Sequence, residues 1–203
     1  MSKPPEPHHA PRPRGLQSRT VLSEDSTQPA APPPNPFTAP DVSAILRERD
    51  WLGAADSPET LAWCERAAAL LGPHADSNRD KLAALLSLVF HYDAREILQQ
   101  VESHLVLARE GARLVIRHLA LLILEGGEVD SDRFKEIIAA LKQRVGFSGR
   151  GLFFPVRLAL AGRPGEGALD RVILLLDSAA RAGFAVPVKG TRQRMLEFCA
   201  ALE

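Results

Sequence analysis

Five basic side chains stand close together between residues 142 and 163, in a stretch that contains no aspartate or glutamate: Lys142, Arg144, Arg150, Arg157 and Arg163. Cations on a glycine-containing loop bind phosphate, and a planar guanidinium also stacks on a base or hydrogen-bonds to its edge. The stretch therefore indicates contact with a polyanion. Because cations are also common near helix C-termini and on exposed loops, the charge pattern alone leaves an ordinary solvated surface open.

The order of the residues in this stretch is more specific than their charge. It reads Gly149-Arg-Gly-Leu-Phe-Phe-Pro-Val-Arg157-Leu-Ala-Leu-Ala-Gly162-Arg163. This resembles the signature of the anticodon-binding region of bacterial glutamyl-tRNA synthetases, Gly-Lys-x-Leu-Phe-x-Pro-Leu-Arg-x-Ala-Leu-Thr-Gly-Arg. Two features differ, since Ala161 replaces the threonine of that signature and the following loop carries an acid, Glu166. Upstream, the resemblance rests on helix spacing and scattered residues, from about residue 78.

The resemblance implies a compact all-helical cage over residues 78–203 that grips the anticodon stem and loop of a tRNA. It gives Arg157 a contact with anticodon bases and places Leu169 in apolar packing near the same base. The other four cations of the stretch are suited to phosphate. Phe153 and Phe154 are either part of this surface or part of the core, and the core is favoured because aromatic residues dominate helix-bundle interiors.

Charge is distributed unevenly along a chain of 203 residues that balances 25 Lys and Arg against 25 Asp and Glu. Residues 41–130 carry nine basic and 15 acidic side chains, a difference of −6, whereas residues 131–203 carry 12 and seven, a difference of +5. An acidic middle and a basic end suit a polyanionic partner that touches one side of the protein.

Several other kinds of chemistry are not supported by the sequence. The His-Ile-Gly-His-like and Lys-Met-Ser-Lys-like signatures of class I synthetases are absent, as is a glycine-rich phosphate loop, so we expect no cofactor and no aminoacylation by this sequence alone. Cys64 and Cys199 have no disulfide or metal-ligand spacing, and His8-His9 lacks a third ligand. We expect a reducing, cytoplasmic setting without a signal peptide or membrane segment, since the apolar run 119–124 is short.

The chain reads as an all-α protein behind a flexible arm. Residues 1–40 hold 11 prolines and few apolar side chains, which predicts a disordered Pro-rich arm. We expect residues 41–77 to form a helical extension, and the resemblance implies that residues 78–203 form the anticodon-binding-like domain. Apolar residues at helical spacing predict eight or nine short helices and no strand. Among them we expect one with Ile97, Leu98 and Val101 inward and one from Pro155 to about Ala161. We expect four helices to be capped by Asp41, by Ser57, by Asp130 or Ser131, and by Thr191.

Three functions remain open at this point. The first is a non-catalytic module that binds tRNA or another structured RNA. The second is a helical protein-interaction scaffold that has lost RNA binding, with the Pro-rich arm recruiting a partner. The third is the non-catalytic part of a split glutamate–tRNA ligase, which acts beside a separate catalytic chain.

Overall fold

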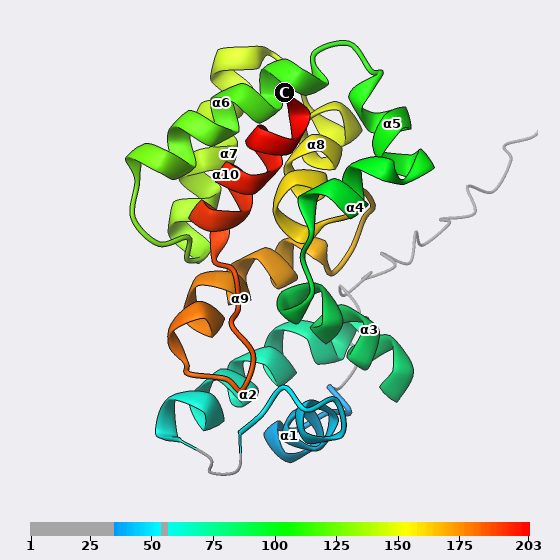
Figure 1. Ribbon diagram of the computed structural model, residues 1–203, viewed down its shortest axis with the longest axis vertical. Coiled ribbons are helices and arrows are strands. Elements are labelled where there is room, and N and C mark those ends of the chain that lie inside the picture. Colours follow the sequence, from blue (N-terminus) through cyan, green and yellow to red (C-terminus); the bar gives the residue numbers. More distant parts are fainter. Residues whose placement is uncertain (1–34, 54–56) are drawn as a thin grey trace, which may run out of the picture. The chain divides into compact units, whose positions relative to one another are not determined.

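The computed structural model describes residues 35–53 and 57–203. Within these residues the chain forms ten α-helices, one 3-10 turn and no strand, which confirms the predicted all-α class (Figure 1). The described helices belong to one compact unit, Pro32–Glu203. Most of the predicted arm, residues 1–34, lies outside the described residues, and so does the His8-His9 pair.

The helices of the unit fall into two packed groups that meet at α9. The first group holds α1 (Ala39–Glu48), α2 (Pro58–Leu71), the turn η1 (Gly72–His74), α3 (Arg79–Phe90) and α9 (Leu169–Arg181), with α2 and α3 both packed on α9. The second holds α4 (Ala94–Gln99), α5 (Val101–Leu107), α6 (Ala112–Glu125), α7 (Ser131–Val145), α8 (Gly149–Ala161) and α10 (Thr191–Leu202). There α6 packs on α7, α8 and α10, while α8 also packs on α9. The domain boundary predicted near residue 78 falls at the start of α3 and stays a prediction.

Helix starts follow the expected capping chemistry, with two corrections. Ser57 and Asp130 accept backbone N–H groups at the starts of α2 and α7 as predicted. Asp41 is not the cap of α1: Thr38 precedes the helix, and the Asp41 carboxylate reaches back to the Thr38 N–H at 2.8 Å. Thr191 is not a cap either, because it is the first residue of α10 and donates its N–H and hydroxyl to Asp177, at 2.7 and 2.9 Å.

The helix that carries the predicted motif is longer than expected. It was predicted to start at Pro155, yet α8 starts at Gly149 and holds Pro155 in its interior. An interior proline costs about 3 kcal/mol through its missing N–H and its clash with the preceding turn. Burial outweighs that cost, because Leu152, Val156 and Leu160 are fully buried on α8.

The prediction that Val101 faces inward is also wrong. The chain is extended at Gln100, so α4 and α5 are separate helices, and this break helps to raise the count above the expected eight or nine. The new helix direction leaves Val101 69% exposed and Leu105, one turn later, 62% exposed.

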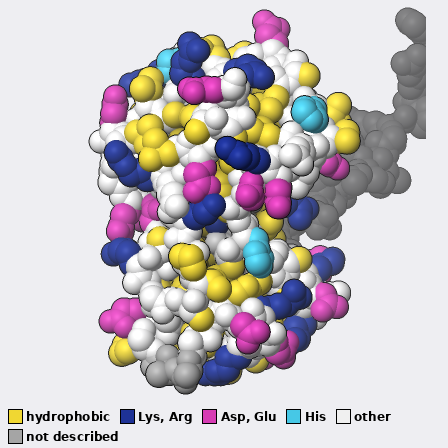
Figure 2. Space-filling view, viewed as in Figure 1, with side chains coloured by type: hydrophobic (Ala, Val, Ile, Leu, Met, Phe, Trp, Pro, Cys, Tyr) yellow, Lys and Arg dark blue, Asp and Glu magenta, His cyan; other side chains and the backbone are white. Residues whose placement is uncertain are grey.

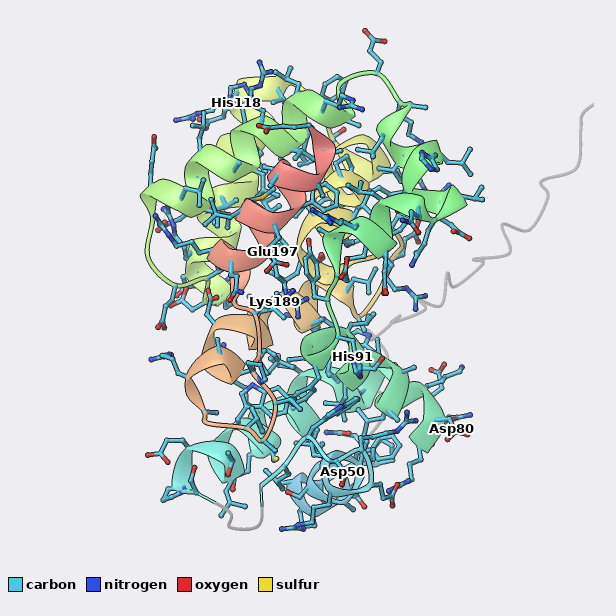
Figure 3. The ribbon with its side chains drawn as sticks, viewed as in Figure 1. Asp50, Asp80, His91, His118, Lys189 and Glu197 are labelled. Atoms are coloured by element: carbon cyan, nitrogen blue, oxygen red, sulfur yellow. The ribbon has the colours of Figure 1, made fainter. Side chains whose placement is uncertain are left out.

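A buried arginine joins the two groups of helices. Arg194 of α10 is fully buried with its guanidinium 4.6 Å from the centre of the Tyr92 ring, and it donates to four backbone carbonyls, those of Leu88, Val89, Leu160 and Lys189. Burial lowers the pKa of Arg194 to about 10 and raises the pKa of Tyr92. The carbonyls at the ends of α3 and α8 carry partial negative charge, which offsets the buried cation. Nearby, Lys189 pairs with Glu197 at 2.7 Å (Figure 3).

Candidate nucleic-acid interface

The six residues predicted to bind RNA do not share one surface. Lys142 and Arg144 are exposed in the last turn of α7, and Arg150 is exposed in the first turn of α8. Arg163 is exposed just beyond the other end of α8, a helix of 13 residues and therefore about 20 Å long. Arg157 and Leu169 are buried, at 9% and 4% exposure.

The guanidinium of Arg157 forms hydrogen bonds within the protein. Its Nε and Nη2 donate to the two carboxylate oxygens of Asp170, both at 2.7 Å, and its Nη1 donates to the carbonyl of Gly165. The guanidinium lies over the Phe153 ring, 5.0 Å from the ring centre. These contacts hold the loop between α8 and α9 against the middle of α8. Contact between Arg157 and an RNA base stays a prediction.

Arg150 is paired more loosely. Its Nη2 lies 2.9 Å from Oε1 of Glu166, and both side chains are largely exposed. An exposed pair of this kind contributes about 0–1 kcal/mol and is screened by salt. A phosphate group can therefore replace Glu166 at Arg150 at little cost. No described acidic side chain forms a salt bridge with Lys142, Arg144 or Arg163.

Two more arginines, outside the predicted stretch, lie near the start of α8. Arg109 and Arg150 both lie over Phe154, 5.5 and 5.9 Å from its ring centre, and Phe154 is partly buried. Arg113 and Arg109 line the same surface pocket, whose volume is about 410 Å³. The sequence contains a signal for these two arginines, because Gly111 lies between them and directly before a strongly apolar helix.

Phe147 brings these cations together. Its ring lies against the bare backbone of Gly111, and it borders the pocket formed by Arg109 and Arg113. The start of α6, the end of α7 and the start of α8 consequently meet at one end of the unit (Figure 1). We call this end of the unit the basic end; its exposed cations are Arg109, Arg113, Lys142, Arg144 and Arg150. Figure 2 shows Lys and Arg side chains at this end, at the top of the view, with acidic side chains among them.

The backbone adds to the positive potential of the basic end. Both α6 and α8, which lie wholly within the described residues, lack a side-chain cap and an acidic residue in the first turn. The free N–H groups of a helix start carry partial positive charge, which favours anions.

Other kinds of site find no support in the part of the chain that the structure describes. No group of His, Cys, Asp and Glu there is arranged to hold a metal ion. No helix there has the length and apolar composition needed to cross a membrane. Cys64 and Cys199 are not in disulfides.

Comparison with known proteins connects the chain to tRNA ligases. No family model and no solved structure matches the sequence. Among curated proteins, it is similar to Glutamate--tRNA ligase 2 of Syntrophus aciditrophicus (strain SB), with 33% identity over 84 residues. The relationship to a glutamate–tRNA ligase is partial and distant. The match covers 41% of this chain and 15% of the ligase.

Proposed function

We propose that this protein is a non-catalytic tRNA-binding module that resembles the anticodon-binding region of glutamyl-tRNA synthetases and acts in the cytoplasm. The observation that carries the proposal is the basic end, where three helix ends gather five exposed cations. The resemblance of residues 149–163 and the similarity to a glutamate–tRNA ligase support tRNA as the polyanion. In this proposal the basic end binds backbone phosphates, and Arg163 adds a contact beyond the other end of α8.

Arg157 takes a positioning role within the proposal. Three of the five N–H groups of its guanidinium bind Asp170 and Gly165, and the residue is only 9% exposed, so little of the guanidinium is accessible to a base. By holding the loop that follows α8, it places Glu166 beside Arg150.

The test is binding of bulk tRNA to the full chain at several salt concentrations. We expect the logarithm of the affinity to fall linearly with the logarithm of the salt concentration, through counterion release. The variant K142A/R144A/R150A should reduce the slope by about 2 units, since each phosphate contact contributes about 0.7 to 0.9. The matched control R49A/R66A/R79A removes three exposed arginines from the first helix group and should leave the slope unchanged. Equal losses in both variants, or no binding at low salt, would refute the proposal.

One observation favours a second candidate function, a protein-interaction scaffold. Val101 and Leu105 form an exposed apolar pair on α5, and exposed apolar patches mark interaction surfaces. A chain that binds no tRNA at low salt, yet binds a protein partner that V101S/L105S abolishes, would support this candidate. A separate catalytic synthetase chain is the partner that a split glutamate–tRNA ligase requires.

A further inference from the structure

We infer that the pocket at the start of α6 binds one unpaired nucleotide of an RNA strand, with its base against Phe147 and its phosphate on Arg109 and Arg113. The inference rests on the proposed RNA-binding function and assigns a subsite within it. Small-molecule pockets start at about 300 Å³, and at about 410 Å³ this one has room for a single nucleotide.

Phe147 is held in place for stacking. A Cβ atom on Gly111 would lie 2.1 Å from Cε2 of Phe147, so the ring occupies space that only a glycine leaves free. Gly111 also has φ +78°, a conformation that other residues adopt at a cost. The ring therefore packs against the backbone of Gly111 and lines the pocket as a partly buried aromatic surface. Aromatic rings of this kind stack on unpaired bases, because every base has a π-face.

The two arginines line the pocket together with that ring. The guanidinium of Arg109 lies over the Phe154 ring, which also lies beside Arg150, and a cation–π contact at an exposed site favours this position by about 0.5–1 kcal/mol. Arg113 lies in the first turn of α6 and lines the pocket with Arg109. Two guanidiniums next to an aromatic ring match the two parts of a nucleotide, its phosphate and its base.

Glu110 also lines the pocket and shapes what binds there. A carboxylate repels phosphate, which places the phosphate on the Arg109 and Arg113 side. It accepts hydrogen bonds from amino groups, which adenine, cytosine and guanine carry and uracil lacks. We therefore expect a preference for adenine or cytosine runs over uracil runs.

The test uses fluorescence anisotropy with labelled RNA octamers, single-stranded and as a duplex, and the full chain. We expect tighter binding of the single strand, and tighter binding of oligo(A) or oligo(C) than oligo(U). R109Q/R113Q should weaken single-strand binding at least tenfold and reduce the salt slope by about 1.4 units. F147L should weaken it about fivefold or more with an unchanged slope, because stacking releases no counterions, whereas F147Y should retain binding. R66Q/R79Q, which removes two exposed arginines of the first helix group, serves as the matched double-cation control and should leave both the affinity and the slope unchanged.

The outcomes separate the subsite from the proposed function. If tRNA binds while R109Q/R113Q and F147L bind single strands as well as the wild type does, the subsite is wrong and the function stands. Equal affinity for the duplex and the single strand, or loss of binding in F147Y as large as in F147L, also overturns the nucleotide subsite. If no RNA binds to the wild type, both fail. Circular dichroism of each variant confirms that the helices are retained.

Discussion

The ion pair between Arg157 and Asp170 decides between two roles for the residue that the motif singles out. Replacing Arg157 by Met keeps the apolar part of the side chain and removes the guanidinium. Asp170 then loses both of its charged donors, and breaking a buried pair in this way costs about 3 to 5 kcal/mol. We expect about 3 kcal/mol, the lower end, because the Asp170 side chain is 26% exposed and lies in the first turn of α9, where the helix start favours an anion.

The measurement is urea unfolding followed by tryptophan fluorescence, with the melting temperature from circular dichroism. Trp51 and Trp63 are both buried and therefore report loss of the core. For a domain of this size, 3 kcal/mol corresponds to a melting temperature lower by about 6 to 12 °C. The double variant R157M/D170L should be more stable than R157M, since it removes the unpaired carboxylate as well.

Binding measured on the folded protein completes this experiment. We expect R157M to bind tRNA at low temperature with a loss smaller than that of K142A/R144A/R150A. The reasoning would be refuted if R157M were within about 0.5 kcal/mol of wild-type stability and yet bound tRNA more than tenfold more weakly. Arg157 would then be a direct contact, as the family resemblance implies.

Three further predictions concern the stability of the fold. Gly111→Ala should cost about 2 to 3 kcal/mol in urea unfolding, from its positive φ and the collision with Phe147, whereas the control Gly127→Ala, whose Cβ would meet nothing within 4 Å, should change stability by under about 0.5 kcal/mol. Arg194→Met leaves four backbone carbonyls without their donor and should lower the free energy of unfolding by about 4 kcal/mol. A loss under about 1 kcal/mol would contradict this expectation. Hydrogen bonds from the Glu96 and Arg95 backbone N–H groups hold the pKa of Asp93 below its ordinary value, so it adds stability above about pH 4 that is lost as the pH falls through its folded pKa. Asp93→Asn should therefore lose less stability than the wild type between pH 6 and pH 3, and an identical pH profile would exclude this contribution.

Most of the helices could be predicted because their signals are local. Apolar spacing and capping residues such as Ser57 and Asp130 act within a few positions of the chain, and they gave the helices near their observed bounds. The start of α8 could not be found in this way. Pro155 is a local signal against a helix interior, and it is overridden by burial of side chains against α6 and α9, which only the folded chain supplies.

The site was harder to predict from the sequence, because the residues that contact its charged side chains come from other segments of the chain. Arg157 stands in a run free of acids, yet the loop after α8 brings Asp170 to it, 13 positions away. Arg109 and Arg113 precede the run by more than 25 positions and join it only through the contact of Phe147 with Gly111. Counting cations along the chain therefore found the basic end only in part.

The hydrogen bonds of Arg194 also bear on when the chain can fold. They reach carbonyls 105 and 106 positions back along the chain as well as one 34 positions back. During synthesis the ends of α3 and α8 have no such donor until α10 has left the ribosome, so the nascent unit holds exposed carbonyls and apolar faces until then.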